Sequence, residues 1–262
     1  MDKKNYVDVA VLAAREAGQF IKSKWGTGVA VELKSEINLV TEVDKAAEKI
    51  IVGHISKIFP DHDIMGEEGL AERKDSDYKW IIDPLDGTTN FAHSYPLFVV
   101  SVALEHKGQI IAGVVYDPLR EELYVATQGG GAFLNGKKIQ VSRVENLGRA
   151  LIGTGFAYNL RESKDNNVKQ FSDMLMHAQG VRRDGAAAID LCYVACGRYD
   201  GFWELNLFPW DVAAGVLMIE EAGGRVSNYK GQNFSVYEKE IVASNGLIHD
   251  EFLAVINRGA SA

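Results

Sequence analysis

Residues 80–91, WIIDPLDGTTNF, place two aspartates three positions apart directly after an apolar run. Two carboxylates this close repel each other unless a positive charge lies between them, which makes Asp83 and Asp86 candidate ligands of a cation. Carboxylate oxygens suit Mg²⁺ or Mn²⁺. Gly87 lets the backbone come close to a ligand, and the two threonines after it are candidates for a helix N-terminus, where exposed amides favour phosphate. A capped turn with solvated aspartates is the simpler alternative.

Four further carboxylates lie where predicted elements begin or end. Glu67 and Glu68 follow the apolar IMG, and such a pair is most often part of a solvated loop. Asp211 would serve as the N-cap of an apolar helix, and Asp44 would be a charge in the first turn of another helix. Functional residues gather at such element ends, so the set as a whole favours an acidic site at which these carboxylates meet.

The composition restricts the possible classes of protein. With 262 residues, 47% of them hydrophobic, the chain can bury a large core, which excludes a disordered protein. The net charge of -8 and the lack of a long run of lysine and arginine argue against binding to nucleic acid. The N-terminus lacks the pattern of a signal peptide, and the apolar runs are too short to span a bilayer. We therefore expect a cytoplasmic protein that binds no membrane.

The two cysteines, Cys192 and Cys196, are spaced i,i+4 within the apolar run LCYVAC. This spacing places both on one face of a helix, where a free cysteine packs as a small hydrophobic residue. No second pair of cysteines exists that could complete a zinc site. We expect both cysteines to belong to the core.

The elements that must position the acidic residues follow from periodicity. Apolar residues recur at helical spacing over 5–24 and again over 41–59, where Thr41 is a candidate N-cap. DIMG and KWIIDPL predict two strands, and the second should stop pairing at Pro84, which cannot donate to a ladder. The region 97–133 alternates β-rich runs with turn signals, which predicts an antiparallel meander, followed by a hairpin at an Asn-Gly pair.

The second half of the chain mixes strands and helices. Strands are predicted at ALIGTGF, FWEL and EIVASN. A Gly-Gly pair provides a C-cap for the helix that Asp211 opens. Helices are predicted over residues 166–176, 185–196, 211–222 and 248–257.

This change in character suggests two halves within one unit of residues 1–262. The N-terminal half, 1–147, is predicted to be α+β and contains most of the acidic candidates. The C-terminal half, 148–262, is predicted to be α/β and contains Asp211. We expect the two halves to pack together as layers of helices and sheets.

Three motifs resemble those of the inositol monophosphatases. They are GEE at 66–68, DPLDGTTNF at 83–91 and PWDVAAG at 209–215. The resemblance runs from LVTEVD at 39–44 to the C-terminal helix. This family belongs to the lithium-sensitive, magnesium-dependent phosphatases, which also include fructose-1,6-bisphosphatases and nucleotide bisphosphate phosphatases. The resemblance implies an α+β fold, a layered αβαβα sandwich with mixed sheets.

The resemblance also implies two or three magnesium ions in each active site. Glu67, Asp83 and the backbone carbonyl of Leu85 would hold the first ion. Asp83, Asp86 and Asp211 would hold the second, and a third, weaker ion would depend on Glu67 and waters. Mn²⁺ is a possible substitute for Mg²⁺.

Further roles carried over from the family concern catalysis and the substrate. Asp44 and Thr88 would activate the attacking water, with Glu67 as a third catalytic residue. Glu204 would bind hydroxyl groups of the substrate. The predicted substrate-binding residues are Leu85, Asp86, Gly87 and Thr88 around the phosphate, and Gly185, Ala186, Ala187, Glu204 and Asp211 around the rest of the molecule.

TNF at 89–91 is the pattern of the inositol monophosphatase branch. The resemblance therefore implies hydrolysis of myo-inositol 1-phosphate to inositol and phosphate through attack by a metal-activated water. A fructose-1,6-bisphosphatase or a dual-activity sugar phosphatase is the alternative. An additional role as a protein partner of the transcription and ribosomal-RNA machinery, or metal binding without turnover, also stays open. Family members are commonly homodimers, and we expect the same here.

Overall fold

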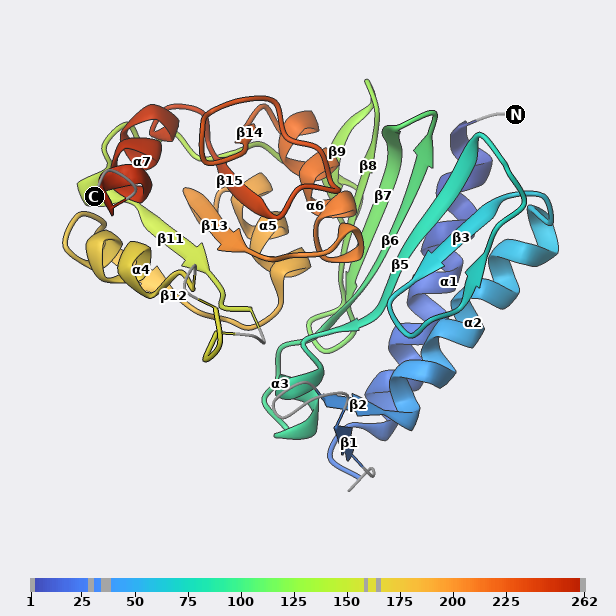
Figure 1. The fold of residues 1–262 in the computed structure, drawn as a ribbon. Coiled ribbons are helices and arrows are strands. Elements are labelled where there is room, and N and C mark those ends of the chain that lie inside the picture. The colour runs from blue at the N-terminus through green and yellow to red at the C-terminus, as the bar shows by residue number, and fades with distance from the viewer. Residues whose placement is uncertain (1–2, 28–30, 34–38, 158–159, 164–165, 260–262) are drawn as a thin grey trace.

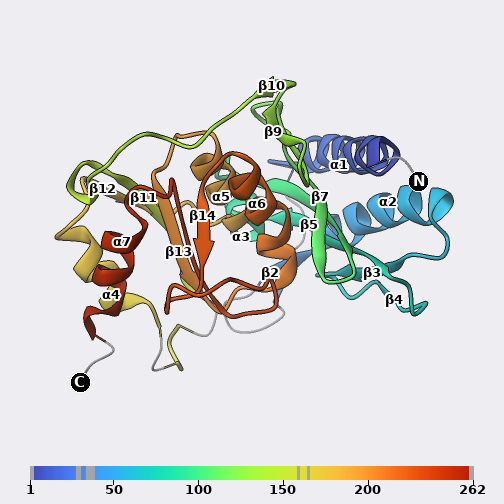
Figure 2. The same ribbon diagram turned by 90° about the horizontal axis from the view of Figure 1, so that it is seen from above.

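The computed structural model describes residues 3–27, 31–33, 39–157, 160–163 and 166–259, and it arranges them in five alternating layers (Figure 1). Helices form the outer layers and the middle layer, and two sheets lie between them (Figure 2). This order confirms the predicted α+β sandwich of αβαβα type with mixed sheets. Within the described ranges, no helix has the length and apolar character needed to cross a membrane.

The first layer consists of α1 (Lys3–Lys24) and α2 (Glu42–Ile58), which pack side by side on the large sheet (Figure 1). The buried residues of α1 recur at helical spacing, and Ala17 and Ile21 among them are fully buried against the sheet. The predictions of helices over these two regions are confirmed.

The large sheet has eight strands in the order β10-β9-β8-β7-β6-β5-β3-β4. Its strands from β5 to β10 pair antiparallel with their neighbours, which confirms the meander and the hairpin, while β3 pairs parallel with β5. A separate ribbon is formed by β1 (Val31–Leu33) and β2 (Leu39–Thr41). The eight strands are β3 (Asp63–Gly66), β4 (Ala71–Glu72), β5 (Tyr78–Asp86), β6 (Val99–His106), β7 (Gln109–Asp117), β8 (Glu122–Thr127), β9 (Gly131–Leu134) and β10 (Lys137–Lys138).

The end of β5 differs from the prediction that pairing stops at Pro84. The strand continues to Asp86, and its register against β6 shifts between the pair Asp83–Ser101 and the pair Asp86–Val99. A bulge accommodates a proline, which has no N–H for the ladder. In a regular strand, residues three apart point to opposite faces of the sheet. Because bulges redirect side chains, the irregularity explains how both aspartates reach one cavity.

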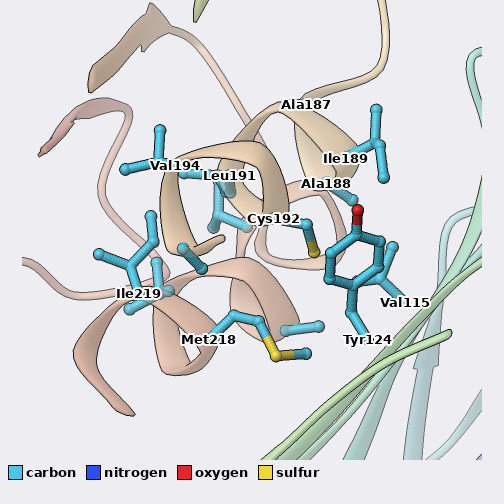
Figure 3. Close-up of a cluster of buried hydrophobic side chains, with 14 of the residues drawn as sticks. Val115, Tyr124, Ala187, Ala188, Ile189, Leu191, Cys192, Val194, Met218 and Ile219 are labelled. Atoms are coloured by element: carbon cyan, nitrogen blue, oxygen red, sulfur yellow. The ribbon is translucent and has the colours of Figure 1, made fainter. Parts of the chain in front are cut away.

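The middle layer consists of α5 (Ala187–Ala195) and α6 (Pro209–Glu221), which are apolar on nearly all sides because a sheet covers each face of the pair. Figure 3 shows Cys192 of α5 close to Tyr124 of the large sheet. Cys192 is fully buried, and Cys196 is partly exposed just beyond the end of α5. Cys192 belongs to the core as predicted, whereas Cys196 packs against the edge of that core.

The second sheet has five strands in the order β12-β11-β13-β15-β14, with α4 and α7 on its outer side (Figure 1). β11 pairs parallel with β12 and β13, and β15 pairs antiparallel with β13 and β14. The predicted strands and helices of this half are confirmed, whereas the division at residue 147 stays a prediction. The elements are η1 (Leu147–Arg149), β11 (Leu151–Thr154), α4 (Val168–Leu175), β12 (Gly180–Arg182), β13 (Gly201–Leu205), β14 (Arg225–Ser227), β15 (Glu240–Ser244), α7 (His249–Ile256) and η2 (Asn257–Gly259).

Candidate active site

A cavity of about 600 Å³ lies beside the bulged end of β5, the starts of α5 and α6, and the short helix α3 (Thr88–Ala92). Of the residues considered for the acidic site, Asp44 and Glu68 do not line this cavity. The predicted residues that line it are Glu67, Asp83, Leu85, Asp86, Gly87, Thr88, Gly185, Ala186, Ala187, Glu204 and Asp211.

Asp44 lies behind the cavity wall, buried in the first turn of α2. The hydroxyl oxygen of Thr88 is 3.0 Å from Oδ1 of Asp44 and 3.0 Å from the carbonyl oxygen of Leu85. A hydroxyl carries one proton, and the carboxylate is the stronger acceptor of the two. Thr88 therefore connects Asp44 to the cavity, although 44 positions separate the two residues in the sequence.

Gly87 precedes α3 and has a φ of 96°, in the left-handed region that favours glycine. A Cβ atom at this position would lie 3.0 Å from the carbonyl oxygen of Leu97, so a side chain would also be crowded. The turn brings the backbone of Gly87 and Thr88 to the cavity wall. This agrees with the prediction that glycine permits close approach of a ligand.

The two aspartates of β5 are buried, and backbone N–H groups hold them in place. Asp83 accepts a hydrogen bond of 3.0 Å from the N–H of Leu85, and Asp86 accepts one of 2.7 Å from the N–H of Ala188. Burial, and after it the charge of Glu67, raises the pKa of Asp83 well above its usual range. Burial also raises the pKa of Asp86 to about 7, although the N–H of Ala188 acts in the opposite direction.

Asp211 occupies a different position in its helix from the one predicted. Phe208 is the N-cap of α6, and Asp211 is the third helical residue. Its Oδ2 atom accepts a hydrogen bond of 2.7 Å from the N–H of Phe208, which satisfies a donor at the helix terminus. Burial, together with the charge of Asp86, raises the pKa of Asp211 well above its usual range. Asp211 therefore stabilises the N-terminus of α6 from the third helical position and also lines the cavity.

Glu48 holds the loop that carries Glu67 and Glu68. The sequence analysis did not identify Glu48. The carboxylate is buried and accepts hydrogen bonds from the N–H groups of Glu68, at 3.0 Å, and Leu70, at 3.2 Å. A Cβ atom on Gly66 would lie 1.9 Å from Oε1 of Glu48, so the carboxylate fits only because this residue is glycine. Glu48 follows Asp44 by four residues, and that spacing on one helix face was the available signal.

Asn90 joins the DPLDGTTNF motif to the loop that contains Asp184 and Gly185. Its side-chain amide donates hydrogen bonds to the carbonyl oxygens of Leu97, at 2.9 Å, and Asp184, at 2.8 Å. Gly185, which follows Asp184, has a φ of 83° and lines the cavity. In the sequence, Asn90 only indicated the branch of the family. In the structure, it holds the loop next to the cavity.

The cavity wall that contains Glu204 also contains polar residues that the sequence analysis did not identify. Glu204 is buried, and burial raises its pKa to about 8 while the nearby Arg183 lowers it. Arg183 is the second residue of an Arg-Arg pair in the sequence. Asp190 is a lone charge within an apolar helix, which was the signal available in the sequence. The additional cavity residues are Thr89, Thr154, Gly155, Phe156, Ala157, Arg183, Asp190, Asn206, Leu207, Phe208, Trp210 and Lys239.

The donor set of the cavity fits a hard divalent cation. Glu67, Asp83, Asp86 and Asp211 offer only oxygen atoms, and the charges that raise the pKa of Asp83 are those of the other three carboxylates. A bound cation would relieve this repulsion. Within the part of the chain that the structure describes, no three His, Cys, Asp or Glu side chains are drawn together closely enough to hold a metal ion. The individual metal ligands therefore stay a prediction.

The five-layer sandwich and its acidic cavity place the protein among the metal-dependent phosphoric monoester hydrolases. A family model described as the inositol monophosphatase family matches residues 2–260, and the chain belongs to this family. Inositol-1-monophosphatase of Mesorhizobium japonicum is 42% identical over 265 residues, which cover 100% of each chain. The Nus factor SuhB of Pseudomonas aeruginosa is 45% identical over 246 residues, which cover 91% of each chain.

Solved structures agree with this assignment. The inositol monophosphatase from Anabaena has 42% sequence identity and a TM-score of 0.88, with 97% of this chain and 95% of that chain covered. The extragenic suppressor protein SuhB from Bartonella henselae has 39% identity and a TM-score of 0.91, with coverage of 97% and 99%. The sandwich is therefore the fold of the family.

Proposed function

We propose that this chain hydrolyses phosphate monoesters with the help of magnesium, and that myo-inositol 1-phosphate is its main substrate. One observation carries the proposal. Carboxylates from three separate stretches of the chain line one cavity together with the backbone of Gly87. They are Glu67, the pair Asp83 and Asp86, and Asp211. Relatives named inositol-1-monophosphatase, from Mesorhizobium japonicum and Synechocystis, support the same substrate.

In this proposal the acidic residues divide between two magnesium ions, with a third held more weakly by Glu67. Glu67, Asp83 and the carbonyl of Leu85 would hold one ion, and Asp83, Asp86 and Asp211 would hold the other. When bound, the ions supply positive charge that reduces the repulsion between the anionic phosphate and an attacking water. Mn²⁺ would be accepted by the same oxygen atoms.

Side chains and backbone groups of the protein would carry out proton transfer and phosphate binding. The Thr88 hydroxyl would accept a proton from the attacking water as it donates its own proton to Asp44, which lies 3.0 Å away. The backbone around Gly87 would bind the phosphate oxygens. Among the described residues, the cavity lining contains no serine, cysteine or histidine. This composition supports direct attack by water rather than a covalent phospho-enzyme.

Replacing Asp83 by asparagine tests the proposal. Asp83→Asn keeps the shape of the side chain but removes a charge shared by both proposed ion sites, so we expect kcat to fall about a thousandfold or more. Asp63→Asn is the matched control, because Asp63 lies in the same sheet but does not line the cavity. Near-normal, magnesium-dependent hydrolysis of myo-inositol 1-phosphate by Asp83→Asn would show that the assignment is wrong.

A sugar bisphosphate is the second candidate substrate. Arg183 and Lys239 line the cavity together with the carboxylates, and two cations provide charge for a second phosphate group. This favours a fructose-1,6-bisphosphatase or a dual-activity sugar phosphatase. Side-by-side measurement of kcat/KM on myo-inositol 1-phosphate and fructose 1,6-bisphosphate separates these possibilities.

An additional role outside catalysis is suggested by relatives from Pseudomonas aeruginosa and Escherichia coli that are named Nus factor SuhB. We propose that the chain also binds a protein of the transcription machinery. Capture of such a partner by both the wild-type chain and the inactive Asp83→Asn variant would support a role independent of turnover.

The expected homodimer stays a prediction. Light scattering after size-exclusion chromatography tests it.

A further inference from the structure

The charged residues that line the cavity are sorted by depth. Six of them carry carboxyl groups, and none of these six is exposed to solvent. They are Glu67, Asp83, Asp86, Asp190, Glu204 and Asp211. Among the described residues, only two cations line the cavity, Arg183 and Lys239, and both are exposed, as is Phe208. Residues that line the cavity and also face solvent mark its opening, so the opening is basic whereas the interior is acidic.

Lys239 pairs with an aromatic ring. Its Nζ atom lies 4.1 Å from the centroid of the Phe208 ring. Within the described ranges, its ammonium group forms no ion pair with an aspartate or a glutamate. Arg183 differs, because its charge acts on Glu204 in the cavity wall. A cation over an aromatic ring keeps its full charge, so Lys239 is free to attract an anion.

The neighbours of Lys239 hold it at the opening. The Phe208 ring stacks on that of Trp210, with 4.9 Å between the centroids and 9° between the planes. The carbonyl oxygen of Lys239 accepts a hydrogen bond of 2.5 Å from the N–H of Asn206, which also lines the cavity. Two residues earlier, the hydroxyl of Tyr237 donates a hydrogen bond of 2.6 Å to the large sheet. The backbone and the side chain of Lys239 are therefore both restrained relative to the cavity.

The separation of charge bears on how a phosphate monoester enters. Such a substrate is an anion, and the acidic interior attracts cations and repels anions until magnesium ions are bound. Charges at the opening of a cleft act on a ligand before it makes contact, and they change its local concentration. A cation at the opening therefore favours the approach of phosphate and opposes the approach of magnesium.

We propose that Lys239, held over the Phe208 ring, attracts the phosphate of the substrate into the cavity. The inference rests on the proposed phosphatase function, and it gives Lys239 a part in substrate capture and none in the chemical step. Because the charge acts from the opening, it should lower KM and leave kcat unchanged. It should act on any phosphate monoester, whatever the leaving group, and it should weaken as salt screens it.

Removal of the charge tests the proposal. At an ionic strength of about 0.02 M, we expect Lys239→Gln to raise KM for myo-inositol 1-phosphate about fivefold and to keep kcat within about twofold of the wild-type value. At about 1 M salt the Debye length is only about 3 Å, so the two KM values should agree within about 1.5-fold. Lys239→Arg keeps the charge and should behave like the wild-type protein. An unchanged KM for Lys239→Gln at low salt, or a raised KM that persists at high salt, would overturn the proposal.

Lys230 offers a matched control. It lies in the same loop between β14 and β15, it is exposed, and it does not line the cavity. Lys230→Gln changes the net charge of the protein by the same amount, so its KM should stay within about 1.5-fold of the wild-type value at both salt concentrations. A rise in KM as large as that of Lys239→Gln would mean that net charge, rather than the position of Lys239, explains the effect.

The magnesium dependence separates the charge of Lys239 from a structural role. Loss of a cation at the opening should ease the entry of magnesium, so the magnesium concentration for half-maximal activity should fall about twofold in Lys239→Gln at low salt. A distorted cavity would instead weaken the binding of both phosphate and magnesium. An increased magnesium requirement in Lys239→Gln would therefore contradict the electrostatic role.

A binding measurement keeps this proposal distinguishable from the proposed function. Calorimetric titration of inorganic phosphate into magnesium-saturated protein at low salt reports affinity without turnover. Wild-type protein that hydrolyses no phosphate monoester but binds phosphate about fivefold more tightly than Lys239→Gln would refute the catalytic proposal and support the attraction of phosphate by Lys239. Equal affinity of the wild-type and Lys239→Gln proteins would refute the role of Lys239, whatever the activity.

Discussion

The hydroxyl oxygen of Thr88 lies 3.0 Å from Oδ1 of Asp44, and this contact joins α2 to the start of α3. Thr88 lines the cavity, whereas Asp44 is buried behind it. In the proposed mechanism, a proton that leaves a molecule in the cavity would reach Asp44 through Thr88. The two side chains would form one path, and removal of either would interrupt it.

Loss of the Thr88 hydroxyl should reduce turnover more than binding. Thr88→Val keeps the shape of the side chain, and we expect kcat to fall about 10²- to 10⁴-fold with little change in KM, because general base catalysis contributes on that scale. Asp44→Asn should give a similar loss. Steady-state kinetics at saturating magnesium measures both.

The double variant tests whether Thr88 and Asp44 act as a unit. Residues that act together show non-additive losses, so Thr88→Val combined with Asp44→Asn should be no slower than the poorer single variant. Thr127→Val, outside the cavity, serves as the control and should retain normal activity. Multiplicative losses in the double variant would contradict the common path.

Glu48 should affect the affinity for magnesium without touching the ion. Glu48→Gln keeps one acceptor oxygen for the two N–H groups of Glu68 and Leu70, so the loop that carries Glu67 becomes less firmly held. Residues that orient metal ligands typically change metal affinity 10- to 100-fold. We expect the magnesium concentration for half-maximal activity to rise by about that factor.

Magnesium titration of activity measures this shift. Glu16→Gln is the control, because Glu16 is exposed, pairs with His54 and does not line the cavity. Its magnesium dependence should match that of the wild-type protein. An unchanged magnesium dependence in Glu48→Gln would mean that the loop keeps its position without the carboxylate.

The sequence predicted most elements, because apolar periodicity and turn residues are local signals. It could not predict the bulge after Asp83, since the shift in register depends on the partner strand β6. The carboxylates were identified by their spacing, but their meeting in one cavity follows from tertiary packing. Glu48 and Asp190 were missed because each looks like an ordinary helix residue until the loop or cavity next to it is known.

Asn90 should contribute to stability through both of its donors. Asn90→Asp replaces the amide that donates to the carbonyl oxygens of Leu97 and Asp184 with an acceptor that faces two acceptors. An unsatisfied buried group costs about 1–3 kcal/mol, so we expect the free energy of unfolding to fall by that amount. Urea denaturation at neutral pH measures it. Asn146→Asp, at an exposed position, should change stability by less than about 0.5 kcal/mol, and an equally small effect of Asn90→Asp would contradict the prediction.

His249 should make the fold sensitive to mildly acidic pH. The ring is fully buried, with Nε2 2.8 Å from the hydroxyl of Ser227 and Nδ1 2.8 Å from that of Ser244. Burial, followed by the charge of Arg225, lowers the pKa of His249 from 6.5 to about 4, while Asp250 acts in the opposite direction. Because the unfolded chain takes up a proton below pH 6.5 and the folded chain does not, stability is full above pH 6.5 and declines as the pH falls toward 4.

Between pH 7.5 and pH 5 this histidine alone should lower the free energy of unfolding by about 2 kcal/mol. Urea denaturation at the two pH values, with a chelator present to keep metal ions away, measures the decrease. In His249→Asn the absolute stability will be lower, but the decrease between the two pH values should be about 2 kcal/mol smaller than in the wild-type protein. His93→Asn, at an exposed position, should retain most of the wild-type pH dependence. If His249→Asn keeps the full decrease, the buried ring is not the group whose protonation destabilises the fold.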